Sequence, residues 1–244
     1  MGSFTESIRS LAESTAQNRA LNNGFYEIWL SRRLTGPQAA TFARNYCAWI
    51  ETVPDQIARV FLSHGDLEAK CETIKNLFSE MGFGDPEKTH ISMLRRYMSD
   101  LVTRVQGSPY NVLEDKRPLL STTHNLTKIQ QELFGNNDPQ VSAGALLAQE
   151  WQAYTMLVQL YEGARLYMPL YGHQIEFHEA CEYFYLHIGE AEKEHKVQSI
   201  HSAEKYCHSQ GDFERIRAGY DGFLKALEGF WIGLAEDITK TDAR

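Results

Sequence analysis

Two segments of the chain place a glutamate three residues before a histidine. These pairs are Glu87 with His90, and Glu192 with His195. On a helix, residues three apart share a face, so each pair can offer a carboxylate and an imidazole to one metal ion. Such mixed ligands suit iron or manganese better than magnesium, which prefers oxygen ligands. At this composition about one such pair is expected by chance, so the spacing alone does not define a metal site.

Three further polar side chains lie in largely apolar segments. Glu150 lies in a mostly apolar helical stretch, His187 follows four apolar or aromatic residues, and Glu80 comes just before a glycine-rich turn. A carboxylate on a core-facing row costs several kcal/mol unless it is paired or bound to a cation. The ordinary alternatives are a salt-bridged glutamate, a hydrogen-bonded core histidine and a surface charge at a helix end. Taken together, separate helical stretches bring acidic or imidazole groups to apolar faces, which favours a metal site between helices.

The elements that would position these side chains are helical. Apolar residues recur at spacings of three and four through nearly the whole chain, and alternating strand patterns are short or absent. This pattern predicts an all-α bundle of about seven or more helices in a single domain, with no internal repeat or linker. The expected parts are an N-terminal helix within residues 1–22, a metal-binding core over 25–202 and a C-terminal helix over 212–238.

Within these parts, prolines and glycines mark the expected helix boundaries. Residues 106–123 contain two prolines and a glycine and are predicted to form a loop with short helical pieces. Helices are expected over residues 5–22, 25–32, 67–81, 175–202 and 212–238. Prolines mark three more: one helix begins near Pro37 and kinks at Pro54, one is capped by Asp85 and Pro86, and a long one begins at Pro139.

Composition excludes several classes of protein. The 244 residues are 43% hydrophobic and 23% charged, with a net charge of −8. The acidic balance argues against a nucleic-acid-binding surface and against attraction to anionic membranes. The four cysteines form no C-x-x-C pair, no apolar run is long enough to span a bilayer, and the N-terminal residues do not resemble a signal peptide. These features predict a cytoplasmic protein.

Several segments resemble the heme-oxygenase-like dimetal oxidases, a family related in fold to thiaminase II-like proteins and to the oxidase of PQQ synthesis. FYEIW at residues 25–29 and LTGPQ at 34–38 resemble the opening of these proteins. NLFSEMGFG at 76–84 followed by His90, AGA at 143–145 leading to Glu150, and EYFYLH at 182–187 running to His195 resemble their ligand segments. The resemblance covers most of the chain and implies a heme-oxygenase-like helical fold.

The resemblance also implies a set of metal ligands. These are Glu80, His90, Glu150, His187, Glu192 and His195, with Glu51 as a seventh ligand of the kind found in N-oxygenating members. The closing motif departs from the family pattern, because Glu192 lies five residues after His187 rather than four. On a regular helix these two side chains would point about 140° apart. A π-bulge would realign Glu192; otherwise Glu190 is the ligand, or this helix is ordered only when metal binds.

By the same resemblance, the protein would bind two Fe(II)/Fe(III) ions per chain and use O₂ to oxidise a small amino acid or amine in small-molecule biosynthesis. The expected outcomes are N-oxygenation, desaturation or carbon–carbon cleavage. Tyr46, Trp49, Tyr97 and Tyr154 are candidates for the substrate pocket, although aromatic rows at helical spacing more often form core. Haem is not expected, because the first histidine, His64, comes too late to be its axial ligand. An electron donor or reductase is a candidate partner, and a homodimer is the expected assembly.

Other functions are compatible with the same sequence. One is a metal-free, thiaminase-like enzyme on this scaffold, with Cys47 or Cys181 as nucleophile. Another is a fatty-acid oxidative decarboxylase. A third is a helical interaction protein in which Glu150 and His187 make ordinary hydrogen bonds. A ferritin-like ligand set would use Glu87 with His90, but Glu87 also suits the first turn of a helix, so Glu80 is the preferred partner.

Overall fold

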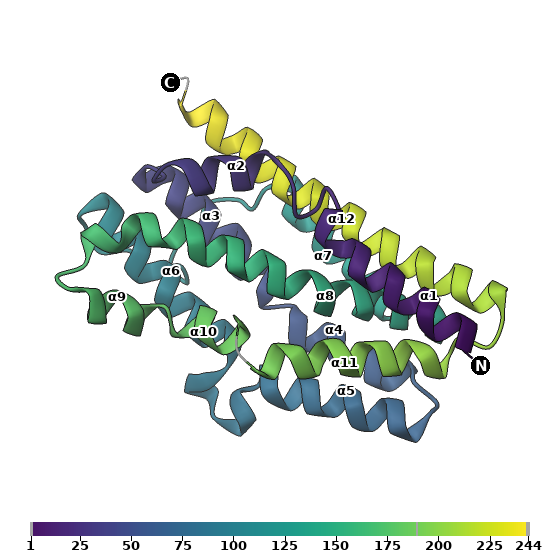
Figure 1. Cartoon of the computed structure of the whole chain (residues 1–244). Helices are drawn as coiled ribbons and strands as arrows, with labels where there is room; N and C mark the ends of the chain where they lie inside the picture. Colours follow the sequence, from purple (N-terminus) through teal and green to yellow (C-terminus); the bar gives the residue numbers. More distant parts are fainter. Residues whose placement is uncertain (1, 189, 243–244) are drawn as a thin grey trace.

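The chain folds into helices that pack around one long helix, α8 (Pro139–Ala164), as Figure 1 shows. The computed structural model describes residues 2–188 and 190–242, and gives only the backbone for residues 2, 3, 187 and 190–195. In that part of the chain there is no β-strand, which confirms the all-α prediction. None of the helices described is long and apolar enough to cross a membrane.

Apart from the loop of residues 107–120, the remaining helices follow one another with short connections. The other α-helices are α1 (Gly2–Glu13), α2 (Gly24–Ser31), α3 (Gly36–Ile50), α4 (Val53–Ser63), α5 (Leu67–Glu80), α6 (His90–Gln106), α7 (Ser121–Phe134), α9 (Gln174–Ala180), α10 (Glu182–Ile188), α11 (Glu190–Lys205) and α12 (Gln210–Asp242). The short 3-10 helices are η1 (Ser14–Gln17), η2 (Gly82–Gly84), η3 (Pro86–Lys88) and η4 (Arg165–Leu170).

Helices α8 and α12 cross at two glycines. A Cβ atom at Gly144 would lie 1.9 Å from the carbonyl oxygen of Ile216, and one at Gly219 would lie 2.0 Å from that of Val141. Only glycine allows the two backbones to approach this closely. The crossing fixes the position of α8, which carries Glu150 six residues further on.

Aromatic side chains fill the space between α2, α3 and α12. The ring centroid of Trp231 lies 4.7 Å from that of Phe25, 5.0 Å from Tyr26, 6.0 Å from Tyr46 and 6.1 Å from Trp49. All five side chains are buried, and pairs in such geometry contribute about 0.5–1.5 kcal/mol each beyond their buried area. The cluster therefore anchors the C-terminal half of α3 in the core.

Two predicted helix boundaries are wrong, and both involve prolines. Pro54 does not kink a continuous helix, because α3 ends at Ile50 and α4 begins at Val53 with proline in its first turn. Asp85 and Pro86 begin only the single 3-10 turn η3. Thr89 then adopts an extended conformation and caps α6 by accepting a hydrogen bond from the Ser92 amide.

Other helices also differ from prediction. The first α-helix ends at Glu13 and the chain continues as the 3-10 helix η1 only to Gln17, after which Asn18 is extended and the Asn22 and Asn23 side chains donate hydrogen bonds to nearby backbone carbonyls. The helix predicted over 175–202 ends at Ala180 and is followed by further helices after a turn at Cys181. Helix α7 was not predicted.

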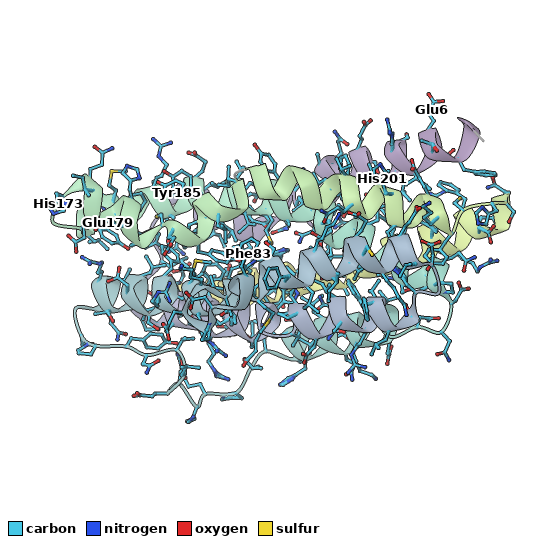
Figure 2. The ribbon with its side chains drawn as sticks, turned by 90° about the horizontal axis from the view of Figure 1, so that it is seen from below. Glu6, Phe83, His173, Glu179, Tyr185 and His201 are labelled. Atoms are coloured by element: carbon cyan, nitrogen blue, oxygen red, sulfur yellow. The ribbon has the colours of Figure 1, made fainter. Side chains whose placement is uncertain are left out.

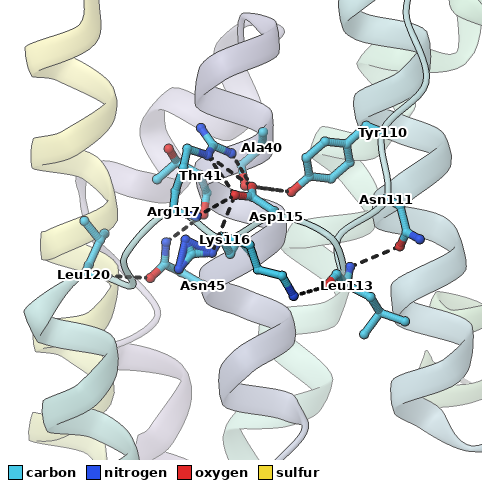
Figure 3. A network of polar contacts seen from close by, with 11 residues as sticks. Ala40, Thr41, Asn45, Tyr110, Asn111, Leu113, Asp115, Lys116, Arg117 and Leu120 are labelled. Atoms are coloured by element: carbon cyan, nitrogen blue, oxygen red, sulfur yellow. Dashed lines mark hydrogen bonds and ion pairs between the residues drawn. The ribbon is translucent and has the colours of Figure 1, made fainter.

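The loop of residues 107–120 contains turns but none of the expected helical pieces. Its central side chain, Asp115, accepts hydrogen bonds from the Tyr110 hydroxyl at 2.9 Å and from Arg117 Nε at 3.0 Å (Figure 3). The Asn45 side chain of α3 accepts a hydrogen bond from the Leu120 amide at 2.9 Å. These contacts hold the loop together and fasten its end to α3.

Candidate metal centre

The end of α5 and the start of α6 bring Glu80 and His90 together. Glu80 is the last residue of α5, and His90 is the first residue of α6. The Oε2 atom of Glu80 lies 2.8 Å from Nδ1 of His90, and their side chains are 12% and 3% exposed. A carboxylate at Nδ1 directs the opposite nitrogen, Nε2, away from it, which is the arrangement by which metal-binding histidines are oriented in proteins.

The intervening turn depends on Gly82. Its φ of +62° lies in the left-handed region, and a Cβ atom there would be 2.5 Å from the carbonyl carbon of Lys88. Only glycine combines that conformation with so close a backbone approach. The glycine-rich segment between Glu80 and His90 is therefore a structural requirement of the pair.

Glu150 reaches the same region from α8. It is 5% exposed, and the Nε2 of the neighbouring Gln149 lies 3.5 Å from its Oε1. Glu80 and Glu150 both line a cavity of about 40 Å³, together with Trp49 and Tyr183. A cavity of that size has room for a few water-sized atoms. The structure thus pairs Glu80 directly with His90 and places Glu80 and Glu150, from α5 and α8, on the same cavity.

The α10 and α11 segments carry the remaining predicted ligands. The side chains of His187, Glu192 and His195, and of the alternative ligand Glu190, lie outside the described part of the structure, as does the expected π-bulge. The backbones of these segments are placed: α10 packs against α6 and α8, and α11 packs against α5 and α8. They therefore run beside the helices that carry Glu80, His90 and Glu150.

Two other acidic candidates lie apart from this centre. The Glu51 side chain is 59% exposed and forms an ion pair with Arg95 at 2.6 Å. The Glu87 side chain is 87% exposed, with its nearest basic partner, Arg96, at 3.8 Å. His90 is thus paired with Glu80 rather than Glu87, despite the Glu-x-x-His spacing of the latter.

The aromatic candidates lie in three different places. Trp49 lines the cavity, and Tyr46 is buried behind it, with its hydroxyl 3.1 Å from that of Tyr183. Tyr97 lines a separate cleft, and the Tyr154 ring lies 4.5 Å beneath the ammonium group of Lys196. Burial raises the pKa of both Tyr46 and Tyr183, so their hydroxyls stay protonated and can donate hydrogen bonds.

Sequence reasoning missed Tyr183 and Gln149 as members of this site. Tyr183 lies in the aromatic run before His187, where its spacing is that of a core residue. Gln149 precedes Glu150 and receives a hydrogen bond from Gln130 of α7 at 2.8 Å. Because α7 was not predicted, nothing in the sequence marked this buried amide pair.

The donor set fits iron as far as its side chains are described. Two carboxylates and one imidazole are the mixture that iron and manganese prefer. Among the described side chains, no group of three or more histidine, cysteine or acidic residues is close enough to hold an ion alone. The three candidate donors would therefore need the α10 and α11 side chains to complete a coordination shell.

Comparison with solved structures shows the fold. The structure is similar to a CADD-like protein of unknown function from Nostoc punctiforme, at 20% identity over 97% of this chain and 99% of that chain, with a TM-score of 0.75. It is also similar to a TenA homolog from Pseudomonas syringae, at 11% identity over 95% and 92%, with a TM-score of 0.71. A domain of unknown function from Shewanella denitrificans with a heme-oxygenase-like fold matches at 13% identity over 99% and 92%, with a TM-score of 0.65. These likenesses confirm the predicted heme-oxygenase-like fold.

Comparison of sequences identifies the family. No curated protein matches the chain. A family model described as an iron-containing redox enzyme matches residues 40–228, a span that includes all of the predicted ligands. The chain therefore belongs to the family of iron-containing redox enzymes.

Proposed function

We propose that the protein is a non-heme di-iron oxidase that uses O₂ to oxidise a small amino acid or amine. The observation that carries this proposal is the buried Glu80–His90 pair beside a cavity that Glu150 also lines, in a member of an iron-dependent redox family. Buried carboxylates and histidines that converge from different helices are the usual ligands of di-iron centres in helical proteins.

The ligand assignments follow the elements that converge on the cavity. Glu80, His90 and Glu150 would hold iron together with His187, His195 and either Glu192 or Glu190. Glu51 would join them only if α3 and α4 rearranged, because its side chain is exposed and paired with Arg95. When bound, two irons would supply the activation of O₂, which no protein side chain can perform alone.

The surrounding residues have roles of their own. Glu80 fixes the orientation of the His90 ring through Nδ1. Trp49, Met156 and Leu157 line the cavity with apolar surface and exclude bulk water. The protonated hydroxyl of Tyr183, which contacts Tyr46, can donate a hydrogen bond to a group in the cavity.

Two rival functions are less compatible with the site. Burial raises the pKa of the Cys47 thiol and raises that of Cys181 to about 12, so neither is suited to act as a thiolate nucleophile near neutral pH. The cavity beside Glu80 and Glu150 holds about 40 Å³, which is smaller than an acyl chain and smaller than an amino acid, so its volume does not choose between these substrates. An amine or amino acid is favoured because the cleft that shares Tyr183 with this cavity is lined mainly by charged rather than apolar side chains.

The test is anaerobic titration of the metal-free protein with ferrous iron, followed by rapid mixing with O₂. We expect uptake of about two irons per chain and a transient visible absorption band that decays faster with the correct substrate. Glu80→Gln and Glu150→Gln should each lower iron uptake. Glu87→Gln is the matched control, because Glu87 has the Glu-x-x-His spacing but lies outside the cavity.

Thermal unfolding gives an independent measurement. Iron that binds only the folded chain should raise the unfolding midpoint of the wild type and of Glu87→Gln. The midpoints of Glu80→Gln and Glu150→Gln should rise much less. Absence of iron uptake by the wild type, or equal uptake by all variants, would refute the metal centre.

A further inference from the structure

Helix α5 turns apolar side chains to solvent. Figure 1 shows this helix at the lower edge of the molecule, where it packs against α4 and α11. Its buried residues are small or polar: Ala69, Thr73, Asn76 and Ser79. Five large apolar residues of α5 and of the turn after it are instead 44–75% exposed: Leu67, Ile74, Phe78, Met81 and Phe83. This arrangement is the reverse of an ordinary surface helix, whose apolar face packs on the core.

The exposed apolar residues follow the spacing of a coiled-coil seam. Successive spacings of four, three, four and three residues lead from Leu67 through Cys71, Ile74 and Phe78 to Met81. Cys71 is exposed like the others. Spacings that alternate between three and four place side chains in one line along a helix, and two such helices bury these lines against each other. We call these five residues the α5 stripe.

Phe83 extends the α5 stripe beyond the end of the helix. Its ring centroid lies 5.5 Å from that of Phe78, in an edge-to-face arrangement. Figure 2, which views the molecule from below, shows Phe83 on the side of the molecule that α5 forms. The φ angle of Phe83 is +55°, a left-handed conformation that is uncommon for a bulky residue and is found mostly at functional positions. The exposed apolar surface therefore continues from α5 into the turn that follows it.

The α5 stripe is complementary to itself when a second copy of the helix runs antiparallel to it. In a symmetric dimer, a residue that contacts a given residue of the partner is itself contacted in the same way by the other chain. A two-fold axis halfway between Cys71 and Ile74 places these two residues opposite each other across the interface. The same axis places Leu67 opposite the partner's Phe78. Each pair forms twice, so apolar contacts extend along about 17 Å of the helix.

The charged residues beside the α5 stripe fit the same register. Glu68 and Lys75 are exposed and lie seven residues apart, so they share one edge of α5. The two-fold axis turns this edge toward the same edge of the partner. Glu68 then lies about 3 Å, measured along the helix axis, from the level of the partner's Lys75, and this pair of opposite charges also forms twice.

The contacts that Glu68 and Lys75 make within one chain do not oppose this pairing. Glu68 contacts Lys205 of α11, and Lys75 contacts Glu72 one turn earlier on α5. All four side chains lie at the surface, where an ion pair contributes little to stability, so its members can exchange or share partners at small cost.

We propose that α5 is the contact surface for a second copy of this chain, and that the two copies form a symmetric dimer in which their α5 helices run antiparallel. The α5 stripe and Phe83 are buried between the copies, and Glu68 pairs with the partner's Lys75. The dimer goes beyond the proposed function and requires no iron. Because Glu80 is the last residue of α5, the interface also supports the helix end that pairs with His90.

The test is sedimentation velocity of the metal-free full-length protein over a range of about 1–200 µM. A pair of helices of this length forms a small interface, so we expect a dimer with a dissociation constant of about 1–50 µM. Glu68→Lys and Lys75→Glu should each weaken the dimer about tenfold, because each places like charges together twice. The double variant Glu68→Lys/Lys75→Glu should restore the wild-type affinity. An equimolar mixture of the two single variants should form heterodimers, since both contacts then join opposite charges.

Ile74→Lys places a charge at the centre of the α5 stripe and should leave the protein monomeric at every concentration tested. Its thermal unfolding shows whether it is folded, and the charge variants, which leave the apolar residues untouched, carry the test if it is not. The matched control is Glu132→Lys, a charge reversal at an exposed residue of α7, which should leave the dimer unchanged. A monomeric wild type, or a double charge variant that is no tighter than the single variants, would overturn the proposal.

Discussion

The carboxylate of Glu80 lies 2.8 Å from Nδ1 of His90, although nine residues that include the two 3-10 helices η2 and η3 separate them in the chain. Glu87, only three residues from His90, points to solvent instead. The reason is that His90 is the first residue of α6 and Glu87 belongs to a preceding 3-10 turn, so the two do not share a helical face. Tertiary contact between the ends of α5 and α6 therefore selects the partner of His90.

Gly82→Ala should disrupt this contact. The alanine would have to keep the left-handed backbone conformation of residue 82, and its Cβ atom would lie 2.5 Å from the Lys88 carbonyl carbon. The turn must therefore open. We expect a loss of at least about 2 kcal/mol in the free energy of unfolding. Chemical denaturation measures this loss, and ferrous titration should show weaker iron uptake.

Gly65→Ala is the control for that substitution, because no atom lies within 4 Å of the added Cβ in its turn between α4 and α5. It should change stability by less than about 1 kcal/mol and leave iron uptake intact. Equal effects of the two substitutions would show that the turn tolerates a side chain at residue 82.

The sequence pointed to Glu80, His90 and Glu150 because each is a polar group in an apolar helical segment, and the structure pairs the first two and places Glu80 and Glu150 on one cavity. It could not show that Glu51 faces solvent, because Glu51 still follows the helical path at the end of α3, and only the packing of the neighbouring helices decides which side of that helix is covered. Arg95, its partner, lies 44 residues away in the chain. Ion pairs of this kind depend on helix packing, which no local pattern encodes.

Helix α7 shows a different limit of sequence reasoning. Its buried positions include Thr123 and Gln130 as well as Leu126 and Phe134. Polar residues on the buried face dilute the apolar periodicity by which helices are recognised. They are tolerated because Thr123 bonds Asn45 at 2.7 Å and Gln130 bonds Gln149 at 2.8 Å. These buried polar residues thus make α7 hard to predict from the sequence, and one of them, Gln130, also holds Gln149, the neighbour of Glu150.

Gly144→Ala should separate α8 from α12. The added Cβ would lie 1.9 Å from the carbonyl oxygen of Ile216, which is backbone and cannot rotate away. We expect a loss of about 3 kcal/mol or more in unfolding free energy. Gly229→Ala in α12 is the control, since nothing lies within 4 Å of its Cβ, and it should be neutral or stabilising by up to about 1 kcal/mol. Denaturant unfolding that ranks the two variants the other way would contradict the close crossing.

Asp115→Asn should loosen the loop of residues 107–120. Hydrogen bonds from Arg117 lower the pKa of Asp115, so its charged form stabilises the folded state, and the amide would lose the charge-assisted bonds. We expect a loss of about 2 kcal/mol in unfolding free energy and faster hydrogen exchange at the Leu120 amide. Glu114→Gln, at the exposed neighbouring residue, should cost less than about 0.5 kcal/mol. If the wild type and Asp115→Asn unfold at the same denaturant concentration, the network contributes no net stability.

His64 should make folding stability sensitive to mild acid. Its side chain is 2% exposed, and burial lowers its pKa to about 4, against about 6.5 in an unfolded chain, in spite of opposing contributions from the Ala69 backbone and Asp66. Between these two pH values the unfolded chain binds a proton that the folded chain does not bind. The free energy of unfolding should therefore fall by about 3 kcal/mol from this residue as the pH drops from 6.5 to 4.

The variant His64→Phe removes this titration and keeps an aromatic ring beside Tyr206, whose centroid lies 5.0 Å away. Its unfolding free energy, measured in urea at several pH values, should fall less steeply between pH 6.5 and 4 than that of the wild type. His124→Gln removes an exposed histidine of α7 and should reproduce the wild-type slope. Parallel pH profiles for the wild type and His64→Phe would mean that the folded protein accommodates a protonated imidazole at residue 64, for instance by pairing it with Asp66.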